Sequence, residues 1–557
     1  MLKRRDFLSA GVGCALPALG FPAIAASSRE GVETAYVNAM VWDGYSVDPA
    51  MSAIGVTEDH IACVGTDAVK AQISKRTRVV DLQGAFVMPG LTDCHTHFSL
   101  ASLALTELDL RSARTPQMLV DQIAARARSV TRGHGVLGTG WDADQWGGTL
   151  PDKSWLDKAT GDVPVSVSRY DLHMLLLNSA ALRLAGINRN TPDVPGGVIV
   201  RDRNGEPTGL LKDAAKTLVE AVIPAYSPNE IDDAMRQGIA LALSKGVTKV
   251  HCPELDWRTH ESLLRLRGQG ETNLRFYSFV PLADWERLLQ QVQEHGWGDD
   301  WVRWGGLKAL ADGSLGSRTA LFQKPYDDDH SLLGVRVHPL KDLLEWTLIA
   351  DRHNFQVAIH AIGDQATHDV LDIFQTVQDK NGPRDRRFRM EHAQSMQIRD
   401  IGRFKKENVI ASIQPYHAID DGRWAVRRIG PERLKGTFAY RSIVDQGAHF
   451  CCGSDWPVAP IDPFTGIKAA VLRQTLDGKN PGGWMPEQKL TLLQALSGYT
   501  TGAAYAGFSE NRMGRILPGL RADFSILDKN IFAIPAEQID QISTLSTIVG
   551  GKVRYAA

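Results

Sequence analysis

Two histidines one residue apart, His95 and His97, are the first feature of the sequence that could carry chemistry. They end an apolar run, residues 91–97, that predicts a β-strand, and successive side chains of a strand point to opposite faces. Asp93, His95 and His97 are therefore expected on one face, where both imidazoles can reach one metal ion. Two ligands alone do not make a metal site. The alternative is a pair of chance histidines on an edge strand, and only further ligands can exclude it.

Later apolar runs end in more side chains that can bind a metal ion. These are Lys308, His360, His392 and Asp455. Taken singly, each has an ordinary explanation: a strand-end histidine is usually hydrogen-bonded, a lysine is solvated or paired, and an aspartate can cap the next helix. With His95 and His97 they make six polar residues at the ends of five apolar strands, and this joint pattern favours a metal centre.

The lysine needs a separate explanation, because a protonated ammonium group only donates hydrogen bonds and cannot bind a cation. A buried Lys308 close to metal ions would lose its proton. The neutral amine can take up carbon dioxide and become a carbamate, which can bridge two metal ions as a carboxylate does. The alternative is one metal ion held by His95, His97 and Asp455, with Lys308 paired to a carboxylate.

The elements that must position these ligands alternate between short apolar runs and helical stretches, which is typical of parallel β/α units. A (β/α)8 TIM barrel brings the carboxyl ends of its strands to one mouth. The candidate strands are residues 91–97, 163–169, 247–252, 274–280, 306–311, 356–361, 387–393, 409–414 and 449–454. One is surplus. The run 163–169 falls in an interval, about 99–228, that is too long for one crossover helix, so we expect an inserted α/β subdomain there.

Both flanks of the predicted barrel carry short β-prone runs separated by turn residues. Residues 30–87 and 507–557 therefore predict a small β-sandwich domain built from both chain ends. The barrel itself is expected to span residues 88–506, including its insertion.

Residues 1–26 are expected to be a twin-arginine signal peptide. Arg4-Arg5-Asp6-Phe7-Leu8 precedes a mildly apolar run, and Ala23-Ile24-Ala25 offers a cleavage site. The alternative is a basic start with a disordered leader. A signal of this kind predicts the twin-arginine export machinery as a partner and a periplasmic or secreted location. Gly11-Val12-Gly13-Cys14 is a poor lipobox, so no stable membrane anchor is expected.

Composition excludes several other classes. The 557-residue chain is 43% hydrophobic and 23% charged with a formal net charge of -2, so no nucleic-acid partner is expected. The five cysteines beyond the leader are scattered and odd in number, which argues against a disulfide framework. The sequence leaves the oligomeric state open, a homo-oligomer included.

The ligand set, in its order along the chain, resembles the amidohydrolase superfamily. More narrowly, it is similar to amidohydrolase family 3, the group that includes N-substituted formamide deformylases. The resemblance covers nearly the whole mature chain and rests on the motifs Pro89-Gly90-Leu91-x-Asp93-x-His95-x-His97, Gly140-Trp141-Asp142, Asp171-x-His173, Lys308-x-x-x-Asp312-Gly313, His360-Ala361-x-Gly363-Asp364 and Gly453-Ser454-Asp455-Trp456-Pro457. One departure is Leu175-Leu176-Leu177 before Asn178, where relatives often carry a tryptophan.

The resemblance implies roles for these residues. His95, His97 and Asp455 hold a first divalent ion, His360 and His392 hold a second, and Lys308, as N6-carboxylysine formed with carbon dioxide, bridges them. Zinc is the expected metal. Asp93 and Asp364 are expected to orient imidazoles from behind. Trp141, Asp142, His173 and Arg318 are candidates for substrate binding.

The expected function is that of a metal-dependent hydrolase acting on a small molecule. A zinc-activated hydroxide attacks a carbonyl, and Asp455 moves the proton to the leaving group. The bond is expected to be a non-peptide C–N amide bond of an N-acyl or N-formyl amine, an activity of EC 3.5 type. One alternative is a lactonase or esterase on the same metal centre. Another is a non-catalytic binding protein on this scaffold, against which the full ligand set counts.

Overall fold

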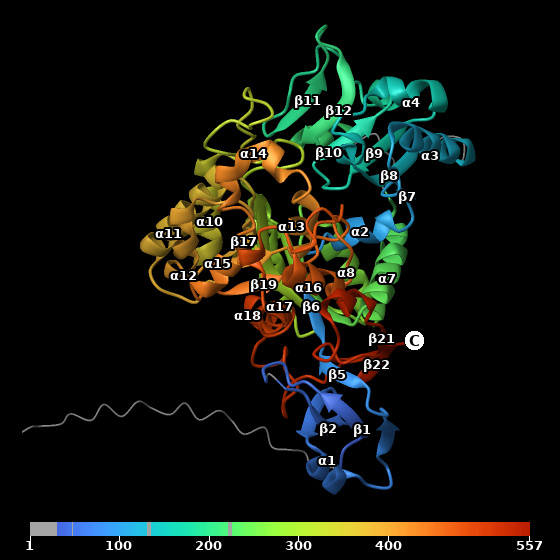
Figure 1. Ribbon diagram of the computed structural model, residues 1–557, viewed down its shortest axis with the longest axis vertical. Coiled ribbons are helices and arrows are strands. Elements are labelled where there is room, and N and C mark those ends of the chain that lie inside the picture. The colour runs from blue at the N-terminus through green and yellow to red at the C-terminus, as the bar shows by residue number, and fades with distance from the viewer. Residues whose placement is uncertain (1–30, 47, 131–134, 221–225) are drawn as a thin grey trace, which may run out of the picture.

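The structure, a computed structural model, describes residues 31–46, 48–130, 135–220 and 226–557 (Figure 1). The signal peptide expected over residues 1–26 lies outside them. The described residues form three β-sheets. Within the same residues, no helix has the length and apolar character needed to cross a membrane.

Parallel strands form the central sheet and close it into a barrel. In spatial order these strands are β19 (Phe450–Cys452), β18 (Ile410–Ile413), β17 (Arg389–His392), β16 (Gln356–Ala361), β15 (Val302–Leu310), β14 (Arg275–Pro281), β13 (Val247–Pro253) and β6 (Leu91–Asp93). The backbone N–H of Cys94 donates to the carbonyl of Cys452 at 3.0 Å and joins the two ends of the sheet. The expected (β/α)8 barrel is confirmed, and its strands are nearly continuous apolar runs because both of their faces are buried.

Helices follow the strands and cover the barrel from outside. They are α7 (Pro228–Ser244), α8 (Arg258–Gly268), α9 (Trp285–His295), α10 (Leu340–Arg352), α11 (Asp364–Asn381), α12 (Ile401–Lys406), α15 (Tyr440–Asp445), α16 (Pro463–Leu472), α17 (Leu492–Tyr499) and α18 (Thr501–Ala506). Local sequence fixes their starts. At α7, the Ser227 side chain accepts from the backbone N–H of Glu230, the Glu230 carboxylate accepts from that of Ser227, and a proline occupies the first turn. Two further helices, α13 (Pro415–Asp421) and α14 (Ala425–Leu434), lie in the loop after β18.

The second sheet belongs to the insertion. Its order is β11 (Gly197–Arg201), β12 (Pro207–Asp213), β10 (Met174–Leu177), β9 (Val165–Arg169), β8 (Val136–Trp141) and β7 (Leu108–Asp109), with α3 (Pro116–Ser129), α4 (Lys153–Thr160) and α5 (Ser179–Leu184) beside it. The surplus run 163–169 is thus β9. The preceding helix α2 (Phe98–Ala104) packs in the main core through Phe98 and Ala101, so it belongs with the barrel.

The third sheet takes strands from both ends of the chain. It contains β22 (Lys552–Ala556), β21 (Thr544–Val549), β20 (Phe524–Leu527), β5 (Phe86–Pro89), β1 (Thr34–Val41), β2 (Ala50–Thr57) and β3 (His60–Val64), with β4 (Arg78–Asp81) on β1 and helix α1 (Thr66–Gln72) against it. The barrel lies between this sheet and the insertion, which occupy opposite ends of the molecule (Figure 1).

Candidate metal centre

The histidine pair is positioned by the barrel closure and not by a strand. The expectation that residues 91–97 form one strand is wrong, because β6 ends at Asp93. The Asp93 carboxylate accepts hydrogen bonds from the backbone N–H groups of His95 at 3.1 Å and Ser454 at 2.9 Å. It therefore ties the end of β6 to the segment after β19, and its hydrogen bonds go to backbone groups, where we had expected it to orient an imidazole.

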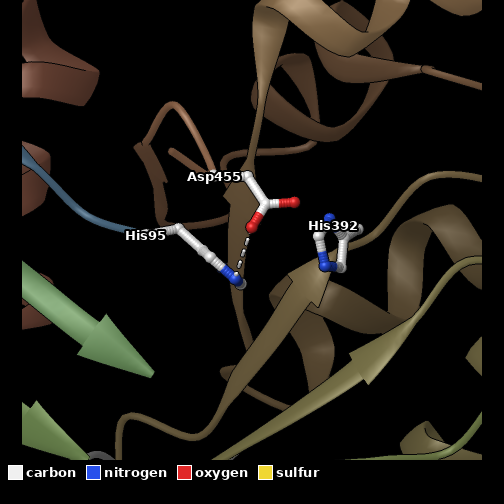
Figure 2. A group of neighbouring side chains, drawn as sticks. All are labelled: His95, His392 and Asp455. Carbon is white, nitrogen blue, oxygen red and sulfur yellow. Dashed lines mark ion pairs between the residues drawn. The ribbon is translucent and has the colours of Figure 1, made fainter. Parts of the chain in front are cut away.

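Five of the six predicted ligands lie close to one another at the barrel mouth. Asp455 Oδ1 lies 3.4 Å from His95 Nε2 and 3.1 Å from His97 Nε2. The His392 ring centroid lies 4.9 Å from that of His95 and 4.5 Å from that of His360. Figure 2 shows His95, His392 and Asp455 facing one another, and each offers one ligand atom within 4.8 Å of the others.

The sixth predicted ligand, Lys308 on β15, is 2% exposed. Burial is the main cause that lowers its pKa, to about 8. Its charge in turn contributes to lowering the pKa values of His95, His360 and His392, so it lies among these imidazoles.

The donor atoms of the centre fit a transition-metal cation. His95 Nε2, His392 Nδ1 and Asp455 Oδ1 are buried without a hydrogen-bond partner in the described residues. Leaving such groups unpaired costs about 1–3 kcal/mol each, which a bound ligand would recover. Imidazole nitrogens with a carboxylate oxygen are a donor set that zinc prefers. His360 differs, because its Nε2 donates to the Gly313 carbonyl at 3.0 Å and leaves Nδ1 with the lone pair.

Each histidine of the pair has a glutamate behind it. His95 Nδ1 donates to Glu391 Oε2 at 2.6 Å, and His97 Nδ1 lies 3.5 Å from Glu254 Oε2. A carboxylate on Nδ1 directs the Nε2 lone pair at a metal ion and makes it more basic. Sequence reasoning missed both glutamates and gave this role to Asp364, which instead accepts from the backbone N–H of Gln323 at 2.9 Å.

Strand alternation concealed Glu391, because it predicts that Glu391 and His392 point to opposite faces. Both side chains meet His95 nonetheless. The backbone leaves the strand in left-handed conformations at His392, with φ 72°, and Ala393, with φ 44°. Non-glycine residues rarely adopt such values, and strain of this kind gathers at functional sites.

The electrostatics of the centre differ between its donors. Burial lowers the pKa of His95 to about 4, and the charge of Lys308 adds to this, so the ring is neutral and able to bind a metal. Burial also acts to lower the pKa of His97, but Asp455 and Glu254 outweigh it and raise that pKa to about 9. Burial acts to raise the pKa of Asp455, yet the imidazoles of His95 and His97 hold it well below its usual range.

A small cavity adjoins the centre. Its lining combines His392 and Asp455 with polar residues from the insertion and from α13, among them Asp171, His173, His417, Asp420 and Asp421. His417 is a further residue that sequence reasoning missed. Its Nε2 lies 3.8 Å from Asp455 Oδ2, and its ring stacks on His392. The sequence offers one indication of this role: His417 lies three residues after the candidate strand 409–414, where the carboxyl end of a barrel strand is expected.

The four substrate-binding candidates are dispersed. His173 lines the cavity, and its Nδ1 lies 2.5 Å from Asp213 Oδ1. Trp141 is instead buried in the core of the insertion, where its Nε1 donates to the Val167 carbonyl. Asp142 caps a short helical turn after β8 and pairs with Arg169, which holds it in the insertion.

Arg318 is the fourth candidate. It donates to both carboxylate oxygens of Asp328, at 3.1 and 2.9 Å. It is thus engaged in an ion pair, and it is absent from the described residues that line the cavity. Of the four candidates, only His173 is among the described residues that line this cavity.

A parallel (β/α)8 barrel with imidazoles, a carboxylate and a buried lysine gathered at the carboxyl ends of its strands defines a metal-dependent hydrolase scaffold. The model of the amidohydrolase family matches residues 78–555. The chain therefore belongs to the amidohydrolase family.

Relatives agree with this assignment. The chain is 36% identical over 531 residues to Protein LONG AFTER FAR-RED 3 of Arabidopsis thaliana, covering 93% of this chain and 91% of the relative. It is 26% identical over 546 residues to N-substituted formamide deformylase of Arthrobacter pascens, covering 93% and 97%. Among solved structures, an uncharacterized metal-dependent hydrolase from Pyrococcus horikoshii superimposes with a TM-score of 0.73 at 26% identity, covering 90% of this chain and 99% of that one.

Proposed function

We propose that this chain hydrolyses the C–N amide bond of a small N-acyl or N-formyl amine. The observation that carries the proposal is the set of buried, unpartnered donor atoms on His95, His392 and Asp455 beside a cavity. The relative named N-substituted formamide deformylase supports the choice of bond.

The residues of the centre divide into two groups around Lys308. His95, His97 and Asp455 would hold one divalent ion, zinc being the proposed metal, and His360 and His392 a second. Lys308, carboxylated by carbon dioxide, would lie between the groups. Metal ions bound there supply Lewis-acid polarisation of a carbonyl oxygen and lower the pKa of a water molecule.

Asp455 is the residue placed to move the proton. Its Oδ1 faces His95 and His97, while its Oδ2 faces His417 and the cavity. We propose that the carboxylate takes a proton from the attacking water and gives it to the leaving nitrogen, which needs a group within hydrogen-bond reach of both. Glu391 and Glu254 hold the two imidazoles in place during this step.

Metal analysis combined with a substrate panel tests the proposal. The mature protein should bind about two zinc ions per chain and cleave N-formyl or N-acyl amines in preference to lactones and esters. Asp455→Asn should retain metal but lose at least about 100-fold in kcat, the range expected for a proton-transfer group. Asp162→Asn on the surface is the control. A metal-free, active protein would contradict the proposal, and cleavage of lactones alone would identify the esterase alternative.

Carboxylation of Lys308 has its own test. Isotope-labelled bicarbonate should give a carbamate carbon signal in the loaded wild type that is missing in Lys308→Ala, and metal loading should depend on bicarbonate. Full loading without bicarbonate, with no carbamate signal, would show an unmodified lysine.

A further inference from the structure

The cavity beside the metal centre has one carboxylate without an ion pair in the described residues. Four aspartates line it, and three have cationic partners. Asp171 pairs with Arg169 at 2.6 Å, Asp420 pairs with Arg423, and Asp455 lies 3.1 Å from His97. Asp421 forms no ion pair in the described part of the chain. Its Oδ2 accepts a hydrogen bond from Gln394 Nε2 at 2.9 Å.

Asp421 is held in an unfavourable place. It is 9% exposed, and burying a carboxylate is costly unless it is paired. It also ends α13, where the negative end of the helix dipole opposes an anion, and it follows a second carboxylate, Asp420. Burial and then Asp420 raise the pKa of Asp421 well above its ordinary value, although the charges of Arg169 and Arg423 and the hydrogen bond from Gln394 act in the opposite direction. A cation in the cavity would relieve all three effects.

An independent observation marks the same cavity as a ligand site. His417 lines the cavity, and its Nε2 is buried without a hydrogen-bond partner in the described residues, so it is a polar atom that the proposed metal centre does not use. His417 and Asp421 are four residues apart on α13, so they share one face of the helix, about one turn or roughly 5–6 Å apart. A ligand can therefore reach both Asp455, through the His417 end, and Asp421.

The cavity also limits the size of the group that fits. Its volume of about 40 Å³ takes a few water-sized groups. That suits an ammonium head group and not an aromatic ring. No lysine or arginine is among the described residues that line it.

We propose that the substrate carries an ammonium group, separated from the scissile amide by a short spacer, and that Asp421 binds this group. The inference rests on the proposed amide hydrolysis and names its substrate class: an N-acyl or N-formyl derivative of a small diamine. Asp421 is thus a specificity-determining residue, and Gln394 fixes its orientation.

A matched series of substrates tests the inference. N-formyl derivatives of propanediamine, aminopropanol and aminopropanoate differ in one head group, which is cationic, neutral or anionic. In the wild type, kcat/KM for the ammonium compound should exceed that for the hydroxyl compound by about tenfold or more, as expected for a hydrogen bond between charged groups. Asp421→Asn should remove this preference while it still cleaves the hydroxyl compound. Asp162→Asn, a change of the same kind on the surface, should keep the preference.

Calorimetry with propylammonium separates this inference from the proposed function, because it needs no turnover. The wild type should bind the amine, and Asp421→Asn should not. Binding of the amine without hydrolysis of any compound would support Asp421 and contradict the proposed reaction. Hydrolysis with equal or greater kcat/KM for the neutral or anionic compound would overturn the inference and leave the reaction standing. The wild-type kcat/KM series and the wild-type calorimetry test the inference even if Asp421→Asn fails to fold.

Discussion

At the scale of single residues, His95 is held from two sides. Glu391 Oε2 accepts from its Nδ1, and Asp455 faces its Nε2. Glu391 is itself fixed by Arg389, whose Nε donates to it at 2.7 Å, and both side chains are fully buried. Burial acts to raise the pKa of Glu391, but the charge of Arg389 and the contact with His95 hold it far below its usual range. Glu391 is therefore an ionised carboxylate behind the imidazole of His95.

We therefore expect Glu391→Gln to weaken metal binding by about 10- to 100-fold, the usual effect of removing a carboxylate behind a metal-bound histidine. The glutamine can still accept from Nδ1, but it lacks the charge that makes Nε2 a stronger donor. Titration of the metal against a competing chelator measures the change.

The matched control is Glu432→Gln, which alters an exposed glutamate paired with Lys435 at 2.7 Å and should leave metal affinity unchanged. Unchanged metal affinity in Glu391→Gln would show that the hydrogen bond to His95 is structural only.

Sequence reasoning found the residues with donor atoms and missed the residues behind them. His95, His360, His392 and Asp455 are visible because each stands at the end of an apolar run. Glu391 and Glu254 lie near such ends too, but their roles depend on distances between different strands, 2.6 Å in one case and 3.5 Å in the other. A sequence does not contain those distances. Strand alternation could have predicted which side chains share a face, but the left-handed backbone at His392 breaks that alternation.

At the scale of elements, the closure between β6 and β19 positions half of the metal centre. The chain passes closely here: a Cβ on Gly453 would lie 2.5 Å from the backbone nitrogen of His95 and 2.9 Å from Asp93 Oδ1. Only glycine fits, because backbone atoms cannot give way as a flexible side chain can.

Gly453→Ala should therefore force the two strand ends apart. We expect a loss of about 1–3 kcal/mol in unfolding free energy, the usual effect of overpacking, together with lower metal content because Asp455 follows two residues later. Thermal melting and metal analysis of the purified variant measure both effects.

Gly402→Ala provides the comparison, since a Cβ there meets nothing within 4 Å. It lies in α12 and should be neutral or stabilising by up to about 1 kcal/mol. If Gly453→Ala melts and binds metal as Gly402→Ala does, the close approach does not constrain the site.

The elements themselves were predictable because buried parallel strands are apolar throughout and thus stand out in the sequence. The run 356–361 coincides with β16, and the surplus run 163–169 is a strand of the insertion. The end of β6 was not predictable. The alternating pattern of the sequence continues to His97, but pairing with β13 stops at Asp93, whose side chain accepts from the backbone N–H of His95.

At the scale of the whole molecule, the barrel separates the insertion from the sheet built from both chain ends (Figure 1). The insertion adjoins the mouth, where Asp142 of the insertion lies 3.5 Å from the guanidinium of Arg423 in the barrel loop. The sheet built from both chain ends lies at the opposite end (Figure 1). Sequence patterns indicated strands at both ends of the chain, but the pairing of β5 with β20 joins segments far apart in sequence and is fixed only by packing.

A buried ion pair joins this terminal sheet to the barrel. Arg275 opens β14, and its Nε and Nη2 donate to Asp523 at 2.6 and 2.9 Å, with both side chains buried. Asp523 also accepts from the backbone N–H of Gly550 at 2.8 Å. One carboxylate thus ties together the barrel, the start of β20 and the turn between β21 and β22.

Asp523→Asn should lower the unfolding free energy by about 3–5 kcal/mol, because it leaves a buried guanidinium without its counter-charge. Thermal melting measures the loss. The double variant Arg275→Met/Asp523→Leu should recover part of it, since apolar replacements leave no buried charge. Asp162→Asn breaks an exposed pair with Arg183 and should melt as the wild type does. If Asp523→Asn matches Asp162→Asn, the pair does not hold the terminal sheet to the barrel, and other contacts join them, such as the hydrogen bonds from Ser525 to Gly246 and from Thr547 to Leu243.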